Sequence, residues 1–401
     1  MHSHNLKTSL SGALDYTYTP ETAELETLSP FSISAFVRQD GNIGIRNDIW
    51  IIPTVGCVNG IAKILAEKTG ALCFTHPYGC SQLGDDLSVT QKTLSGLIRH
   101  PNAGGVLVLG LGGENNNIAE LKKALGKLND ERIRFLNCQD YEDEIAQGIS
   151  IIKELQAIAD KDRRETVPVS KLKIGLKCGG SDGLSGITAN PMCGRITDKT
   201  VAMGGTAILT EVPEMFGAEQ LLMNRCINET VFNKTVNLIN NYKNYFIAHH
   251  QPVSENPSPG NKAGGITTLE EKSLGCVQKG GNAPITAVLS YGDTAERPGL
   301  NLLDGPGNDM VAVTNLTAAG CHLILFTTGR GTPLGAPVPT VKIATNTSLA
   351  ERKKSWIDFD AQSGTDESLL KLIRETANGK KTKNEQHGIS EIAIYKDGVT
   401  L

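Results

Sequence analysis

The feature that most constrains the fold of this chain is a regular alternation, from Phe36 onward, of short apolar runs with longer segments of helical period. Parallel strands need a crossover between them, so this alternation is typical of βαβ units with right-handed connections. In the first half we expect strands at 49–55, 71–76, 105–111 and 132–138, and helices at 58–68, 87–99, 118–128 and 141–159.

A charged segment at 160–165, followed by Val167-Pro168, indicates a linker between this half and a second set of elements. Further along we expect strands at 172–178, 206–211, 299–303, 322–327, 340–345 and 392–395, with helices at 218–249 and 309–319. The sequence therefore predicts an α/β fold with two Rossmann-like parallel-sheet domains, over 36–165 and 166–401.

Composition excludes several classes of protein. The 43 glycines show no G-X-Y repeat and suit tight turns between strands and helices. A net charge of −4 gives no basic surface for nucleic acid, and we find no secretory signal and no apolar run long enough to cross a membrane. The nine cysteines show no C-x-x-C spacing, which favours reduced thiols in the cytoplasm over a disulfide framework.

Thiol, imidazole and carboxylate side chains follow the expected strands, each close to glycine. In open α/β sheets ligands bind outside the carboxyl ends of the strands, so these groups are candidates for one shared site. His, Cys and carboxylate ligands together favour a transition metal over calcium or magnesium, although the spacing matches no zinc ribbon. The alternative is that each lone cysteine is a small core residue. The candidates are Cys57, His76, Cys80, Glu114, Cys178, Ser181, Asp182 and Glu211.

Two loops carry cationic side chains between glycines and prolines. The loop 257–265 contains Lys262, and the loop 326–333 contains Arg330 and Thr332. Backbone amides with Lys262, or the fork of Arg330, could hold a carboxylate; an ordinary turn and a solvated arginine are the plain alternatives. Gly110-Leu111-Gly112-Gly113 does not meet the dinucleotide spacing. Cations and hydroxyls beside a metal would suit a small polyhydroxylated acid.

Long stretches around these residues resemble the altronate/galactarate dehydratase family, from about Phe36 to Leu401. The stretches 211–219 and 397–401 are closest to the altronate branch. The stretches that carry the resemblance are 38–47, 53–60, 78–86, 178–191, 211–219, 258–265 and 328–333.

In that family a small antifreeze-like (SAF) domain precedes this region and ends in a histidine-rich segment that resembles His2-Ser3-His4-Asn5. The resemblance implies that this chain starts just after that domain, as a truncated form or a split subunit, with 1–35 as the linker. Without the resemblance, the polar start reads as a frayed terminus, a tag remnant or a linker. Gly113 stands where the family usually has cysteine.

The resemblance implies a hydro-lyase that converts D-altronate to 2-dehydro-3-deoxy-D-gluconate with Fe²⁺ or Mn²⁺. The proton next to a carboxylate is weakly acidic, so elimination needs a Lewis acid on the carboxylate, a base for the proton and an acid for the departing hydroxyl. The implied roles are metal ligands Cys57, Cys80, Cys178 and His4; catalytic residues His76, Glu114, Glu211 and Lys272; and substrate-binding residues Arg46, Asn47, Ser181, Asp182, Asn190, Lys262, Arg330 and Thr332.

The expected partners are the small sugar-acid substrate, an SAF domain in cis or in trans, and further copies of the chain in a homo-oligomer. Two alternatives remain within the family, namely galactarate dehydration and elimination of sulfite from sulfolactate. An alternative of another class is a non-catalytic portion that binds a sugar acid and needs the SAF domain for activity.

Overall fold

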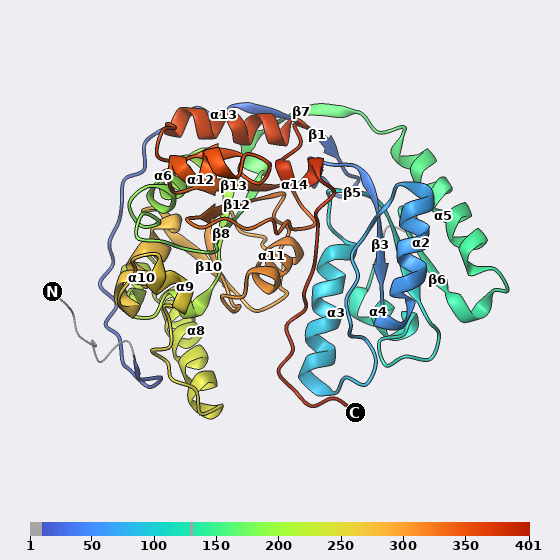
Figure 1. Ribbon diagram of the computed structural model, residues 1–401, viewed down its shortest axis with the longest axis horizontal. Coiled ribbons are helices and arrows are strands. Elements are labelled where there is room, and N and C mark those ends of the chain that lie inside the picture. The colour runs from blue at the N-terminus through green and yellow to red at the C-terminus, as the bar shows by residue number, and fades with distance from the viewer. Residues whose placement is uncertain (1–9, 129–130) are drawn as a thin grey trace.

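The computed structural model describes residues 10–128 and 131–401. It confirms the α/β class, with two parallel sheets of four and seven strands joined by a small antiparallel sheet. Figure 1 shows the two halves side by side, with the first half in blue and cyan and the second in green to red. No helix among the described residues is long and apolar enough to cross a membrane.

The first sheet has the order β4-β3-β5-β6, and all its strand pairs are parallel. Alternate residues of β3 enter opposite cores: Ile49 and Ile51 pack with α2 and α5, while Trp50 and Ile52 pack with α3 and α4. Its strands are β3 (Asp48–Pro53), β4 (Leu72–Cys73), β5 (Ala103–Gly110) and β6 (Ile133–Asn137), and its helices are α2 (Asn59–Thr69), α3 (Gly84–Ile98), α4 (Ile118–Leu125) and α5 (Glu144–Ala159).

The second sheet has the order β10-β11-β9-β8-β12-β13-β14, again entirely parallel. After β8, the chain places β9, β10 and β11 on one side of it and then β12, β13 and β14 on the other side. The topological switch point therefore lies between β8 and β12. The strands are β8 (Lys173–Cys178), β9 (Thr206–Leu209), β10 (Ile285–Leu289), β11 (Gly299–Leu303), β12 (Leu323–Thr328), β13 (Thr340–Ala344) and β14 (Phe359–Asp360).

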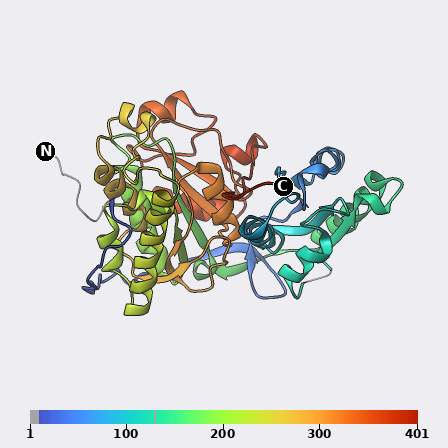
Figure 2. The same cartoon turned by 90° about the horizontal axis from the view of Figure 1, so that it is seen from below.

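Helices cover both faces of this sheet (Figures 1 and 2). Those of one face share a large core: α6 (Ala189–Ala202), α7 (Glu219–Met223), α8 (Glu229–Ala248), α10 (Leu269–Val277) and α13 (Asp366–Ala377). On the other face α11 (Asp309–Ala318) packs against α3 of the first half. A Cβ on Gly96 would lie 2.4 Å from the carbonyl oxygen of Ala318, so only glycine permits this approach. One apolar core therefore joins the two parallel sheets.

The expected linker is partly wrong, because its end forms a strand. β7 (Arg164–Pro168) pairs antiparallel with β1 (Ser32–Val37), which also pairs with β2 (Ile43–Gly44). Asp162, within the segment expected as a linker, accepts hydrogen bonds from Arg38 and Arg132. The segment ties the two halves together through a sheet instead of separating them.

Two further expectations need correction. The helix expected at 218–249 is split into α7 and α8, because the side chain of Asn228 caps a new helix by accepting from Val231 N–H. The strand expected at 392–395 joins no sheet. Ile392 and Ile394 are buried there, but the neighbouring amides of Ala393 and Tyr395 donate to the hydroxyls of Thr314 and Tyr291. Burial alone produced that apolar pattern.

The described part of the N-terminal stretch packs against α8 and α7. The carbonyls of Gly12 and Leu14 accept from Asn244 and Asn240 of α8, and Glu21 N–H donates to the Asn224 carbonyl after α7. The Tyr16 hydroxyl donates to Glu219 over 2.8 Å, and the Tyr18 ring lies 4.9 Å from that of Phe232. These two tyrosines anchor a segment whose composition reads as polar linker. His2 and His4 lie outside the described residues.

Candidate functional site

A group of interacting charged side chains lies at the switch point of the second sheet. β8 ends at Cys178, and its loop runs past Ser181 toward α6. Two residues after β9, Glu211 adopts a left-handed conformation with φ of 72°. That conformation turns the chain sharply into the short helix Val212–Glu214, so the carboxylates of Glu211 and Glu214 both enter the same buried region.

Glu211 lies between two buried lysines. Lys177 forms ion pairs with Glu211 and, over 2.9 Å, with Asp309, while Lys279 Nζ lies 3.0 Å from the other Glu211 oxygen. Burial alone would lower the pKa of both lysines, but the charge of Glu211 raises the pKa of each above its ordinary value. Burial raises the pKa of Glu211 above its ordinary value, and the two ammonium groups oppose that shift.

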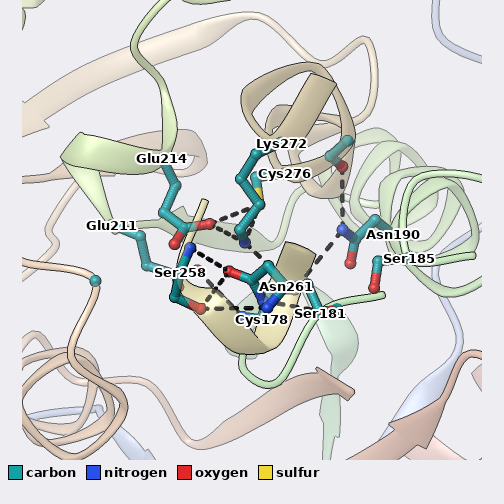
Figure 3. A network of polar contacts seen from close by, with 12 residues as sticks. Cys178, Ser181, Ser185, Asn190, Glu211, Glu214, Ser258, Asn261, Lys272 and Cys276 are labelled. Carbon is teal, nitrogen blue, oxygen red and sulfur yellow. Dashed lines mark hydrogen bonds and ion pairs between the residues drawn. The ribbon is translucent and has the colours of Figure 1, made fainter. Parts of the chain in front are cut away.

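A second cluster surrounds the ammonium of Lys272 (Figure 3). Lys272 Nζ donates to Ser181 Oγ over 3.0 Å and to Cys276 Sγ over 3.1 Å, and it forms an ion pair with Glu214. Cys276 Sγ lies 2.8 Å from the same Glu214 oxygen, and Cys178 Sγ lies 2.6 Å from Ser181 Oγ. A continuous chain of contacts thus joins two thiols, a hydroxyl, an ammonium and a carboxylate.

The charges in this cluster fix where protons reside. Although burial alone would raise the pKa of Glu214, the ammonium groups of Lys272 and Lys177 lower it to about 2. A hydrogen bond from Cys276, with the charges of Lys279 and Lys272, lowers the pKa of Cys178 well below that of a free thiol. The same hydrogen bond and burial raise the pKa of Cys276. Of the two thiols, Cys178 is therefore the stronger acid.

A cavity of about 510 Å³ adjoins the Lys272 cluster. Ser181, Asn190, Lys272 and Cys276 line it, together with the start of α10. This volume is in the range of sites for small organic ligands. Side chains that can hold protons therefore lie at the wall of a cavity large enough for a six-carbon acid.

Several residues predicted from the sequence come together here. Cys178, Ser181, Glu211 and Lys272 are all in the two clusters described above. Asn190 is buried beside them and accepts from the Thr327 hydroxyl over 2.6 Å. Asp182 instead accepts from Ser185, Thr345 and Asn346, so it holds the β8 loop against the end of β13.

The two cationic loops lie next to this cluster. Asn261 donates to the Ser181 carbonyl over 3.0 Å, and Arg330 donates to the Gly260 carbonyl over 2.9 Å. The side chains of Lys262 and Arg330 are exposed. The carbonyl of Thr332 accepts from Lys342, and its hydroxyl accepts from Leu334 N–H. Roles for these three residues in substrate binding remain predictions.

The predicted catalytic residues of the first half, His76 and Glu114, make contacts within that half. His76 is buried, with Nε2 2.8 Å from the Pro53 carbonyl and Nδ1 accepting from Tyr78 N–H, and burial lowers its pKa. Both ring nitrogens are thus engaged by backbone. Glu114 accepts from the Thr54 hydroxyl and from two loop amides, and Cys57 and Cys80 are exposed. These contacts give no support to His76 or Glu114 as a base.

The expected metal centre is not assembled by the described residues. Among residues 10–128 and 131–401, no group of three or more His, Cys, Asp or Glu side chains could hold a metal ion. His4 lies outside them. Gly113 faces open space, so the cysteine that the family usually has there would fit without displacing a neighbour. The metal-ligand roles of Cys57, Cys80, Cys178 and His4 therefore remain predictions.

Arg46 and Asn47, predicted to bind substrate, make structural contacts. Arg46 pairs with Glu385 over 2.6 Å and donates to the carbonyl of Thr376, so it ties the β2–β3 turn to the C-terminal region. Asn47 accepts from Arg38 and donates to the Ala159 carbonyl.

We expect Arg46→Met to lower the free energy of unfolding by about 2–4 kcal/mol, because it leaves Glu385 and several carbonyls without their partner. Urea unfolding measures this, with the exposed Arg352→Met as a control. A rise in KM without loss of stability would return Arg46 to the substrate site.

Sequence reasoning missed Lys177, Cys276 and Lys279. Lys177 lies inside a buried strand, where alternation places it on the face opposite Cys178. Cys276 is four residues after Lys272 and Lys279 is seven, so all three fall on one helical face. That spacing was the available signal. Glu214 lies in the stretch 211–219 that carries the family resemblance, but no role was predicted for it.

Side chains that can hold and exchange protons lie buried at the switch point of a parallel sheet, beside a cavity. This arrangement is that of an α/β enzyme. The model "D-galactarate dehydratase/Altronate hydrolase, second domain" matches residues 35–160, and "D-galactarate/Altronate dehydratase, C-terminal" matches residues 169–400. The chain belongs to the galactarate/altronate dehydratase family.

Relatives agree with this assignment. The chain is 53% identical to the altronate dehydratase of Escherichia coli (strain K12) and 52% identical to that of Bacillus subtilis (strain 168), in each case over its full length and 85% of the relative. It is 33% identical to the galactarate dehydratase (L-threo-forming) of Escherichia coli (strain K12), over 92% of this chain and 78% of the relative.

Proposed function

We propose that this chain is a hydro-lyase that dehydrates D-altronate. The observation that carries the proposal is the buried Lys272 ammonium, in contact with Ser181, Glu214 and Cys276 at the wall of the 510 Å³ cavity. Two relatives above 50% identity are altronate dehydratases, whereas the galactarate enzyme is more distant. Elimination of water from an aldonate needs a base, an acid and a fixed positive charge, which this cluster contains.

In the proposed mechanism, the proton on C2 passes to the Ser181 hydroxyl as that hydroxyl gives its own proton to the Cys178 thiolate. Lys272 stabilises the negative charge that develops on the substrate carboxylate. As the C3–O bond breaks, the Cys276 thiol protonates the departing hydroxyl, and water leaves. The resulting enol tautomerises to a 2-oxo-3-deoxy acid.

This sequence of transfers leaves Cys178 as the thiol and Cys276 as the thiolate. The hydrogen bond between the two thiols returns the proton and restores the starting state. The mechanism therefore requires both cysteines in reduced form, and we propose that the chain works in the cytoplasm. All nine cysteines are free.

The proposal is tested by supplying D-altronate and measuring formation of a 2-oxo-3-deoxy acid, with galactarate and sulfolactate in parallel. We expect turnover on altronate, and a fall in kcat of about 100-fold or more in Ser181→Ala, because the relay loses its hydroxyl. Ser363→Ala, at an exposed turn, is the matched control. Sulfite release from sulfolactate, or unchanged turnover in Ser181→Ala, would contradict the proposal.

We propose Fe²⁺ or Mn²⁺ as the cofactor, which when bound would polarise the substrate carboxylate. The switch-point thiols and carboxylates do not fit this ion as they are, because Lys177, Lys272 and Lys279 already pair with them. Ligands would have to include other residues, His4 among them. Metal analysis, and reversal of chelator inactivation by each ion, tests this.

We further propose that an SAF domain, in cis or in trans, and a homo-oligomer complete the enzyme. Mixing the chain with a separate SAF domain separates two possibilities. Binding of altronate without turnover until the domain is added would indicate a sugar-acid-binding portion, and turnover by the chain alone would remove the requirement.

A further inference from the structure

A second cavity, of about 630 Å³, lies at the carboxyl ends of β10 and β11 and is unused by the proposed reaction. Helix α8, the loops after the two strands and the C-terminal segment enclose it. The loop that begins at Asp304 separates it from the switch point. Asp304 and Pro306 face the cavity, whereas the Gly307 carbonyl accepts from Lys177. The two sites therefore share a wall but not their side chains.

Four tyrosines line this cavity and contact one another. The Tyr242 and Tyr245 rings lie 5.7 Å apart, Tyr245 and Tyr395 lie 6.4 Å apart, and Tyr291 and Tyr395 lie 5.7 Å apart. Aromatic faces carry negative charge density and attract cations. The four tyrosines come from α8, the loop after β10 and the C-terminal segment, so the fold brings them together from distant parts of the sequence.

Carboxylates outnumber cations in this cavity. Asp293, Asp304 and Asp397 line it, against Lys234 alone. Asp293 pairs with Lys92 and Asp397 with His249, so two of the three have partners. Asp304 has no ion pair with a described Lys, Arg or His. A carboxylate without an ion-pair partner among the described cations, in a cavity lined by tyrosines, repels an anionic sugar acid and favours a cation.

We propose that this cavity binds a small organic ammonium ion, with Asp304 as its counter-ion and the tyrosine rings around its alkyl part. The volume is too large for a bare metal ion and suits an alkyl diamine or amine of similar size. The proposal does not depend on the reaction proposed above, since it concerns binding alone.

Burial raises the pKa of Asp304 to about 6. The carboxylate is therefore charged above that pH and neutral below it. The groups that face it are Lys234, Tyr242 and Tyr245 from α8, Tyr291 and Asp293 from the β10 loop, and Tyr395 and Asp397 from the C-terminal segment. His249, which pairs with Asp397, is a further titratable group at this wall. Because burial raises the pKa values of the tyrosines, their hydroxyls stay neutral, and ionisation of Asp304 should make amine affinity rise from about pH 5 to about pH 7.

Calorimetric titration of the full chain with 1,4-diaminobutane at low ionic strength tests the proposal. We expect saturable binding to one site that potassium chloride at matched ionic strength does not reproduce. Asp304→Asn should weaken it about tenfold, equivalent to about 1.4 kcal/mol. Tyr245→Leu should weaken it several-fold. Asp160→Asn, an exposed carboxylate of the first half, should leave it unchanged.

Asp304→Asn keeps the shape of the side chain and removes an uncompensated charge, so its thermal midpoint above pH 6 should equal or exceed that of the parent chain. If its midpoint falls, Tyr245→Leu and the pH dependence of the parent chain still decide the question. Absence of saturable heat, equal affinity in Asp304→Asn, or affinity that does not rise with pH would overturn the proposal.

Discussion

Replacing Lys272 with methionine should lower kcat on altronate by about 1,000-fold or more. The substitution removes the ammonium that contacts Ser181, Cys276 and Glu214 together, and preorganised charges of this kind supply several kcal/mol of transition-state stabilisation. Methionine keeps the length and apolar stem of the side chain, so the cavity wall is preserved. Steady-state assays with the exposed Lys371→Met as control measure the effect.

The same variant should change the state of the nearby thiols. Without the Lys272 charge, the pKa of Cys178 should rise toward that of a free thiol, because one of the cations that lower it is gone. The rate at which the Cys178 thiol is alkylated in the folded protein, measured as a function of pH, reports this shift. Full activity in Lys272→Met, with the fold intact by circular dichroism, would remove the cluster from the reaction.

The largest effect on stability is expected from Glu211→Gln. The variant leaves Lys177 and Lys279 buried with one fewer anion, and breaking a buried ion pair from one side costs about 3–5 kcal/mol. Denaturant unfolding should show a lower midpoint with an unchanged slope.

The matched control is Glu375→Gln, which breaks exposed ion pairs with Lys371 and Lys380. Exposed pairs of this kind contribute about 0–1 kcal/mol. Equally small losses of stability in both variants would mean that Asp309 and backbone carbonyls are sufficient partners for the buried ammonium groups of Lys177 and Lys279. The ion pairs of Glu211 with Lys177 and Lys279 would then have no large effect on stability.

The strands of both parallel sheets were predictable where both faces are covered. A run such as 105–111 is apolar throughout because β5 packs against helices on both sides. The antiparallel strands were not recognised as strands, since β1 carries serines and β7 is charged, and their pairing joins residues about 130 positions apart. Such pairing depends on the tertiary fold and leaves little local pattern.

The candidate site was predictable where it coincides with strand ends. Cys178 is the last residue of β8 and Glu211 comes two residues after β9, so the rule for open sheets finds them. Lys177 and Lys279 were not found, because an isolated lysine in a sequence is normally read as solvent-exposed. Only the tertiary structure shows that both meet Glu211. The same rule also selected His76, whose environment is a backbone-bonded core position.

The contact of α3 with α11 has a consequence for how a substrate reaches the cavity. Because Gly96 admits the Ala318 backbone at close range and a continuous apolar core surrounds that contact, swinging the halves apart would expose a large dry interface to water. We expect entry and product escape to rely on local displacement of surface loops, such as residues 266–268 at the wall of the cavity. Turnover should therefore respond to rigidifying substitutions in that loop far more than to crosslinks between the halves.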